Sequence, residues 1–429
     1  MNGLAELMEI FLRRWLMKSG MMKIGLPSFI LLLLFLAAGL VFYPAAQAAE
    51  KEFVWAIVDD YSGPFAATGD EGHKATVLFL EEHNYKMGPY KVKLVTRDTE
   101  LKPAVGVRRL QEVIDEAKPL VVSSGNSSAV QLAMADIIGK TKGPIFWTDG
   151  WDTRLTGAQG NRYTFRWASP NYTIARASLS GFLDKFPEVK KVIQIQMDYA
   201  WGYDMAENVE AVLKERGIKL LKTQYVPATA IDVSVFMTEA KGSGADAYII
   251  GLYGKIFGIG LRQAHEFGLK KVMKVFSITG TLNMLRGIGS DALEGMYLAD
   301  HWNHAMPNEW SRKFVEKYKK RWGVIPGDYA AKKYLECQLM ERVVKQTGSA
   351  DPKVIIPALE KLGEFDGPTG KEYMAAWQHQ IVHDFLLLRG KSPGEKKYED
   401  DFVEVIGAGR IYPKQGEKGF EFDRTKDPL

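Results

Sequence analysis

The sequence has little cysteine and little net charge. Its 429 residues contain one cysteine, Cys337, which excludes an internal disulfide framework, a Cys-rich zinc site and an iron–sulfur cluster. The 56 Lys and Arg residues nearly balance the 52 Asp and Glu residues, and a net charge of +4 gives no reason to expect a phosphate backbone as partner. We therefore expect no nucleic-acid partner. Cys337 stands in a helix-like stretch and is predicted to be a buried structural thiol.

Motifs of catalysis and cofactor binding are also lacking. The sequence has no Gly-x-Ser-x-Gly elbow and no P-loop. Residues 287–292 match a dinucleotide fingerprint superficially, but they run into a strand-like stretch and predict a turn. His379 and His383, and the cluster at residues 300–304, lack the context of metal ligands. We expect no metal, no cofactor and no catalytic residue, which favours a binding protein over an enzyme.

The first 48 residues are predicted to be a signal peptide. Basic residues precede an uncharged run from Ile24 to Ala49, and Ala46-Gln47-Ala48 supplies the small-x-small pattern that signal peptidase needs. An uncleaved membrane anchor is the alternative, because the uncharged run is long enough to span a bilayer. Pro27 and the Pro44-Ala45 junction favour cleavage after Ala48 and a periplasmic mature chain.

The mature chain alternates short β-branched or aromatic runs with amphipathic segments, which is typical of βα units and parallel sheets. The predicted strands are 53–59, 91–97, 120–124, 144–148, 163–167, 191–197, 220–226, 247–253, 275–279 and 295–299. So many strands favour two α/β lobes over one sheet. Residues 310–322, 329–347 and 352–362 are helical in pattern, and the last β-like stretch is 380–388.

Polar turns follow two of the predicted strands, at the sheet edge where open α/β folds bind ligands. Residues 61–69 contain Ser62 and Thr68 between a Gly-Pro turn and a helix. Residues 123–128 contain Asn126, Ser127 and Ser128 in front of the next helix, where free amides and hydroxyls can meet a carboxylate or carbonyl oxygen. A simple helix cap is the structural alternative.

With these turns the sequence resembles the periplasmic substrate-binding proteins of branched-chain amino acid type ABC transporters. The resemblance covers essentially the whole mature chain. It rests on Ser62-Gly63-Pro64, Asp98-Thr99, the serine loop, Leu155-Thr156, Tyr199-Ala200-Trp201-Gly202, residues 254–264 and Trp377-Gln378-His379-Gln380. Each piece is short, but their order and spacing are specific.

The resemblance implies an α/β type I periplasmic-binding fold, with two Rossmann-like lobes joined by three hinge crossovers near 167–170, 299–302 and 380–384. Lobe 1 is then 49–168 plus 301–380, and lobe 2 is 169–300 plus 381–429. The implied function is the solute-binding component of an ABC importer, which captures an amino-acid-like compound, an aromatic acid or an amide and delivers it to the permease. We expect a monomer.

The resemblance also implies site residues. The hydroxyl of Ser128 matches the group that holds a ligand carboxylate, and the loop 147–153 provides neighbouring contacts. Trp201 and Tyr253 correspond to aromatic contacts from the second lobe. The candidate ligand-binding residues are Ser62, Thr68, Asn126, Ser127, Ser128, Trp147, Asp149, Gly150, Trp151, Asp152, Trp201, Tyr253 and Thr279.

The sequence departs from the family at Thr279. The family's amino-acid binders carry an acidic side chain there for the ligand ammonium, and a buried ammonium without a partner is costly. The departure argues against an ordinary α-amino acid, unless Asp149 or Asp152 replaces the lost carboxylate from the other lobe. Trp147, Trp151, Trp201 and Tyr253 favour a flat or aromatic ligand, or else some of them pack the lobe cores. Ligand identity stays open.

Two alternative functions belong to other classes. The same fold serves as a ligand-sensing module of signalling proteins. A sensor or regulator gene beside this one, in place of permease and ATPase genes, would favour that function. An exported hydrolase is the enzyme alternative, and it needs a Ser–His–Asp constellation that the predicted crevice does not supply.

Overall fold

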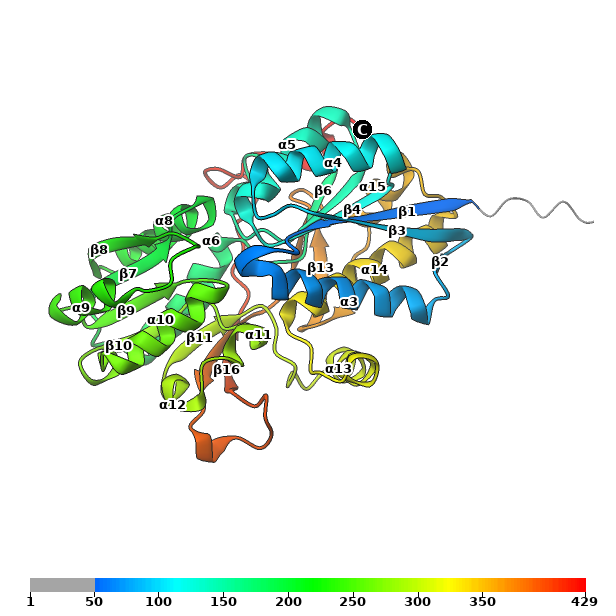
Figure 1. Ribbon diagram of the computed structural model, residues 1–429. Helices are drawn as coiled ribbons and strands as arrows, with labels where there is room; N and C mark the ends of the chain where they lie inside the picture. The colour runs from blue at the N-terminus through cyan, green and yellow to red at the C-terminus, as the bar shows by residue number, and fades with distance from the viewer. Residues whose placement is uncertain (1–50) are drawn as a thin grey trace, which may run out of the picture. The chain divides into compact units, whose positions relative to one another are not determined.

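The computed structural model describes residues 51–429, so the predicted signal peptide lies outside the described residues. Within this part of the chain the strands form two sheets, each covered by helices (Figure 1). Each strand predicted between residues 53 and 299 has a counterpart within a few residues of its expected ends. The arrangement confirms the predicted α/β fold class with two lobes.

The sheet of the first lobe has nine strands within residues 51–429, in the order β12-β13-β14-β6-β5-β4-β1-β3-β2. The central strands are parallel, and β1 pairs with both β3 and β4. All residues of β1 after its first are buried, as expected for a strand covered on both faces. The bounds are β1 Glu52–Asp59, β2 Lys86–Met87, β3 Tyr90–Asp98, β4 Val121–Ser124, β5 Ile145–Thr148, β6 Thr164–Arg166, β12 Glu364–Gly367, β13 Gly370–Ala375 and β14 Gln380–Val382.

The sheet of the second lobe has seven strands within the same described range, in the order β16-β15-β11-β10-β9-β7-β8. From β8 to β11 the neighbours are parallel, and β15 adds antiparallel to β11. The bounds are β7 Lys191–Met197, β8 Lys219–Val226, β9 Ala247–Gly251, β10 Lys274–Ser277, β11 Tyr297–Asp300, β15 Phe385–Gly390 and β16 Val403–Gly409.

Helices cover both faces of each sheet. On the first sheet α4 and α5 lie on one face, and α3 and α14 lie on the other (Figure 1). The first-lobe helices are α3 Ala66–Glu82, α4 Pro103–Ala117, α5 Ser128–Thr141, α13 Glu309–Trp322, α14 Asp328–Thr347 and α15 Pro352–Glu360. The second-lobe helices are α6 Asn171–Ile174, α7 Ser180–Lys185, α8 Ala200–Glu215, α9 Ser234–Gly242, α10 Lys255–Glu266, α11 Leu282–Leu285 and α12 Ser290–Leu293. A π-helical turn, η3 Ala175–Leu179, joins α6 to α7.

Local sequence explains where several of these helices begin and end. Pro103 opens α4, where its missing N–H costs nothing. The Asn308 side chain caps α13 by accepting a hydrogen bond from the Ser311 amide at 2.8 Å. Gly323 ends α13 with a φ of +75°, a backbone conformation that glycine adopts without strain.

The chain passes between the two sheets at three crossovers. They are residues 167–170 between β6 and α6, residues 301–308 between β11 and α13, and residues 383–384 between β14 and β15. Side chains from the three crossovers pack together: the rings of Trp167 and His383 stack with centroids 4.0 Å apart, and His301 lies 6.1 Å from each of them. The three hinge crossovers of the predicted fold are therefore present.

The C-terminal tail returns to the first lobe, contrary to the assignment of 381–429 to lobe 2. Arg424 donates a hydrogen bond to the Gly157 carbonyl at 2.6 Å, and Arg162 donates one to the Asp427 carbonyl at 2.7 Å. No sequence pattern predicts this return, because the contacts go to single carbonyl groups. The division of the chain between the lobes is otherwise still a prediction.

Each lobe has its own hydrophobic core, built around its sheet. Cys337 lies on α14 inside the first core and is buried, which confirms the predicted structural thiol. Among the described residues, none of the helices has the length and apolar character needed to cross a membrane.

Candidate functional site

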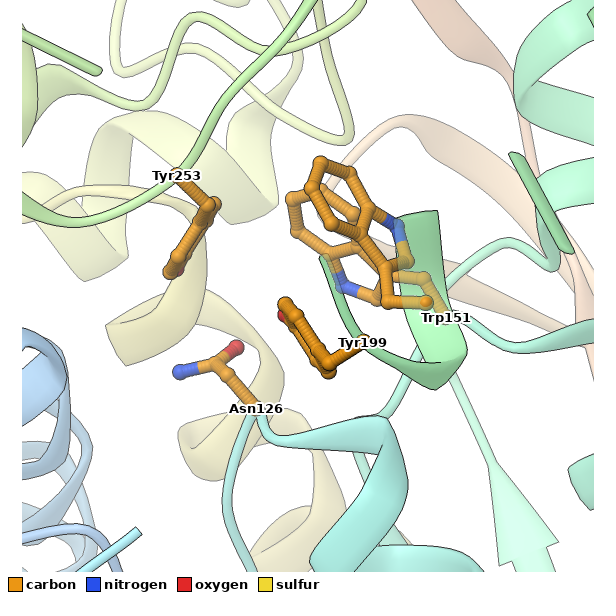
Figure 2. Close-up of a pocket in the computed structure, with 5 residues that line it drawn as sticks. Asn126, Trp151, Tyr199 and Tyr253 are labelled. Carbon is orange, nitrogen blue, oxygen red and sulfur yellow. The ribbon is translucent and has the colours of Figure 1, made fainter. Parts of the chain in front are cut away.

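Five side chains from the two lobes line a common pocket, shown in Figure 2: Asn126, Trp151, Tyr199, Trp201 and Tyr253. Asn126 and Trp151 follow β4 and β5 of the first sheet, whereas the other three follow β7 and β9 of the second. The carboxyl ends of parallel strands bring these turns together. The cavity that the five side chains enclose has a volume of about 10 Å³, which is room for about one water molecule.

The aromatic walls of the pocket meet at steep angles. The Trp151 ring is nearly perpendicular to Trp201 (centroids 5.6 Å apart, 77°) and to Tyr253 (5.2 Å, 86°). Trp201 and Tyr253 are 6.3 Å apart at 69°, and Tyr199 lies 6.1 Å from Trp201. Such edge-to-face contacts are favourable between aromatic rings. They hold the rings of the two lobes as walls around one space.

Phe65 of the first lobe contacts Tyr253, one of the residues that line this pocket. It ends the short 3₁₀ turn η1 (Gly63–Phe65), and its ring lies 5.0 Å from Tyr253 at 82°. Gly254 lies beneath it: a side chain added there would stand 2.8 Å from the Phe65 ring and 2.9 Å from the Pro64 carbonyl oxygen. A contact this close between the lobes requires glycine at residue 254.

Several polar atoms of the pocket lack partners. Among the described residues, none forms a hydrogen bond with the indole N–H of Trp151 or Trp201, or with the amide oxygen and nitrogen of Asn126. These side chains are at most 7% exposed. Buried polar groups in proteins are almost always hydrogen-bonded to protein, water or ligand. The pocket therefore offers several donors and one acceptor to a bound molecule.

The serine loop is held by contacts within the first lobe. The hydroxyl oxygen of Ser128 accepts hydrogen bonds from the amides of Trp151 and Asp152, at 3.2 and 3.1 Å. The Ser127 amide donates to the Asp60 carboxylate at 3.4 Å. Ser128 thus positions the turn that carries Trp151, and its role toward a ligand carboxylate is still a prediction.

Other predicted site residues lie apart from the five that line the pocket. Asp149 forms an ion pair with Lys333 at 2.6 Å, and Asp152 forms one with Arg154 at 2.6 Å. The Trp147 ring packs on Phe165 in the first core, with centroids 5.5 Å apart. These contacts are internal to the first lobe.

The remaining predicted residues lie near the cleft or under it. Thr279 donates a hydrogen bond to the Leu252 carbonyl at 2.8 Å, inside the second lobe. Gly150 is buried against Leu155 and Gln131. Thr68 lies beside the Tyr253 hydroxyl. Ser62 is half-buried beside Asp98. A hydrogen bond from Ser62 helps to lower the pKa of Asp98.

Buried charges lie behind the pocket on the first-lobe side. Burial and the neighbouring Asp59 raise the pKa of Asp60 to about 7, and burial and Asp328 raise the pKa of Glu71 to about 8. Lys332 lies 3.0 Å from Asp328 and 5.7 Å from the centre of the Trp151 ring. Desolvation makes such groups costly unless they are paired.

One cluster resembles a metal site. Ligand atoms of Asp300, His301 and Asp328 all lie within 4.8 Å of one another, and all three residues are buried. The Lys332 ammonium already supplies a positive charge 3.0 Å from Asp328. Burial and this ammonium hold the pKa of His301 well below its usual value. The cluster is thus organised around a salt bridge.

Tyr199, Phe65 and Lys332 are not among the site residues predicted from the sequence. Tyr199 and Phe65 lie in the turns that follow β7 and β1, so their place after a strand was the available signal. Lys332 follows Asp328 by one helical turn in α14. That spacing predicts an i,i+4 ion pair, but it does not predict burial against the cleft.

Known proteins are similar to this chain in sequence and in fold. A model of the periplasmic binding protein family matches residues 56–396. The Leu/Ile/Val-binding protein homolog 7 of Brucella suis biovar 1 (strain 1330) is 26% identical over 334 residues, which is 74% of this chain and 79% of the relative.

Solved structures are similar over most of the chain. The amino acid ABC transporter substrate-binding protein from Pseudomonas fluorescens Pf-5 has a TM-score of 0.80 and 29% identity, and the match covers 85% of this chain and 97% of that one. A solute-binding protein of an ABC transporter from Rhodopseudomonas palustris BisB5, in complex with 3,4-dihydroxybenzoic acid, has a TM-score of 0.74 and 22% identity, covering 84% and 97%.

Proposed function

The chain belongs to the periplasmic binding protein family, and from this premise we propose that it is the extracytoplasmic solute-binding component of an ABC importer. It captures a small organic solute between its lobes and presents the closed form to the permease, without chemical conversion. The predicted signal peptide and the family agree with a periplasmic location. The proposed ligand contacts are Asn126, Trp151, Tyr199, Trp201 and Tyr253.

The observation that carries this proposal is that each lobe supplies walls of one pocket. Asn126 and Trp151 belong to the first lobe, and Trp201 and Tyr253 belong to the second. A ligand that contacts both lobes binds the closed state better than the open one and shifts the equilibrium toward closure. A ligand that contacted one lobe alone would not shift it.

Thermal-shift screening followed by calorimetry tests the proposal. The purified mature protein is screened with amino acids, aromatic acids, amides and amines, because a ligand of the folded state raises the melting temperature. Tyr253→Leu is then expected to weaken binding of the hit about tenfold or more, since it removes an aromatic wall.

Tyr248→Leu is the matched control for this change. Tyr248 lies on β9 in the core of the second lobe, where its hydroxyl donates to Gln224 at 2.8 Å. Its replacement should lower stability and leave ligand affinity unchanged. Equal affinities of the wild type and of Tyr253→Leu would show that the ligand binds elsewhere. Loss of uptake of the hit in a strain lacking the gene tests the importer role.

A further inference from the structure

We propose that residues 410–429 form a strap that bridges the two lobes along the hinge and favours the closed form of the cleft. This segment follows β16 of the second sheet and returns to the first lobe (Figure 1). It lies beyond residues 56–396, which the family model matches. The inference goes beyond the proposed function, because it concerns a further link between the lobes in addition to the three crossovers.

The strap first binds two of the crossovers. The Tyr412 hydroxyl lies 2.9 Å from the Ser169 hydroxyl and accepts a hydrogen bond from the His383 amide at 3.4 Å. Arg410 donates to the Asp384 carboxylate at 2.9 Å. Ser169 belongs to the first crossover, whereas His383 and Asp384 belong to the third. Because hinge residues absorb the backbone rotation of domain closure, these contacts resist that rotation.

The strap then contacts the second lobe at Tyr172 of α6. The Tyr172 hydroxyl donates to the Glu417 carboxylate at 2.8 Å, and the Phe420 ring lies 5.7 Å from the Tyr172 ring at 75°. Phe420 is only 5% exposed, so the hydrophobic effect stabilises this contact. The strap is therefore held to the second lobe by a buried ring as well as by a hydrogen bond.

The next part of the strap lies on the first lobe. The Phe422 ring lies 5.6 Å from the Trp377 ring, and the Arg424 amide donates to the Trp377 carbonyl at 2.8 Å. The Arg424 side chain is 8% exposed, and its guanidinium donates to the Gly157 carbonyl at 2.6 Å. A buried charged donor loses much of its hydration, so release of this bond is costly.

These anchors constrain the angle between the lobes. Opening of the cleft rotates one lobe against the other, which changes the separation between Tyr172 and Gly157 and the backbone at Ser169. All the anchors are engaged in the structure, in which the cleft encloses a cavity of about 10 Å³. Opening therefore requires the release of at least one anchor. A larger closed population before binding raises the apparent affinity for a ligand that binds the closed form.

Distances between spin labels on the two lobes test the proposal. Gln111→Cys on α4 and Lys241→Cys on α9 are exposed labelling positions, whereas Cys337 is buried. The residues Pro103, at the start of α4, and Ala228, before α9, line one hollow between the lobes. The mature protein is refolded from denaturant to remove bound solutes, and double electron–electron resonance gives the distance distribution. No ligand enters the measurement, so its outcome does not depend on the proposed function.

A chain that stops after Gly409 keeps β16 and lacks the strap. We expect its mean label distance to be longer than in the full chain by more than about 2 Å, with a broader distribution. An unchanged distribution in a truncated chain that has the circular dichroism of the full chain, or a shorter mean distance, overturns the proposal.

Two single changes decide the question if the truncated chain fails to fold. Tyr412→Phe removes the hydroxyl that links the crossovers, and Arg424→Gln removes the guanidinium bound to Gly157. Each should raise the ratio of open to closed form about fivefold. Tyr248→Phe is the matched control, because it removes one hydrogen bond inside the second lobe, to Gln224 at 2.8 Å. If neither variant differs from this control, the proposal is wrong.

Discussion

Lys333 is the residue on which the buried charge of the first lobe depends. Its ammonium lies 2.6 Å from Asp149 and 3.3 Å from Glu336, and it donates to the Ser123 hydroxyl at 2.7 Å. Burial alone would lower the pKa of Lys333, but Asp149, Glu336 and Asp59 raise it above its usual value. The lysine therefore stays charged and compensates carboxylates that the fold has removed from water.

We expect Lys333→Met to lower the free energy of unfolding by about 3–5 kcal/mol, because it leaves buried carboxylates without a counter-charge. Urea unfolding monitored by circular dichroism measures the change. Lys317→Met is the control, since Lys317 forms a surface pair with Glu82 at 3.1 Å and such pairs contribute about 1 kcal/mol or less. A loss as small for Lys333→Met as for the control would contradict the role assigned to Lys333.

At the scale of single residues the sequence allowed only part of the site to be predicted. Asn126, Trp151, Trp201 and Tyr253 were selected because they follow strands, and they line the pocket. Asp149 was considered as a partner for a ligand, but it is bound to Lys333 of a helix far along the chain. Position after a strand predicts which sheet edge a residue occupies, whereas its partner depends on long-range packing.

At the scale of elements, the buried parallel strands were predictable from the sequence, whereas several antiparallel strands and one short helix were not. Buried parallel strands are continuous apolar runs, so β1 and β9 stood out in the sequence. The antiparallel strands β12 and β13 have few buried residues and contain glycines and charged residues, and β16 has only Val403 buried, so all three were missed. The short helix α9 was missed because only Met237 and Ala240 of its residues are buried.

The short turn η1 and the start of α10 form the contact that closes the cleft. Gly254 has a φ of +69°, and an added methyl group there would meet Phe65 at 2.8 Å and Pro64 at 2.9 Å. We expect Gly254→Ala to weaken ligand binding, because the methyl group separates the lobes in the closed state. It should also reduce stability by about 1–3 kcal/mol through backbone strain.

Gly217→Ala separates these two effects. Gly217 also has a positive φ, +66°, but an added methyl group there meets nothing within 4 Å. Backbone strain should lower the melting temperature of this control. Its ligand affinity, measured by calorimetry, should stay at the wild-type value. Unchanged affinity in Gly254→Ala as well would mean that closure does not require the contact with Phe65.

At the scale of the whole molecule, the dependence of stability on pH reflects buried groups whose pKa values are shifted in opposite directions, as Glu71 and His383 illustrate. Burial and Asp328 raise the pKa of Glu71 from 4.5 to about 8, so the folded state binds this proton more tightly than the unfolded chain. The stability that it contributes is complete below pH 4.5 and is lost as the pH rises to about 8. Burial lowers the pKa of His383 from 6.5 to about 4, so its contribution is lost as the pH falls from 6.5 to about 4.

The two contributions separate above pH 6.5, where His383 is neutral in the folded state and mostly neutral in the unfolded chain. Between pH 6.5 and 8 we expect the free energy of unfolding to fall, with Glu71 contributing up to about 2 kcal/mol of the loss. Glu71→Gln should flatten this part of the profile, because the amide does not titrate and its oxygen can still accept a hydrogen bond from the Gly327 amide. Glu210→Gln on the exposed face of α8 should keep the wild-type slope in urea titrations across this range. A wild-type stability that rises from pH 6.5 to 8, or an unchanged slope in Glu71→Gln, would show that Glu71 is ionised in the folded protein throughout, and that the contact between α3 and α11 is made by a carboxylate.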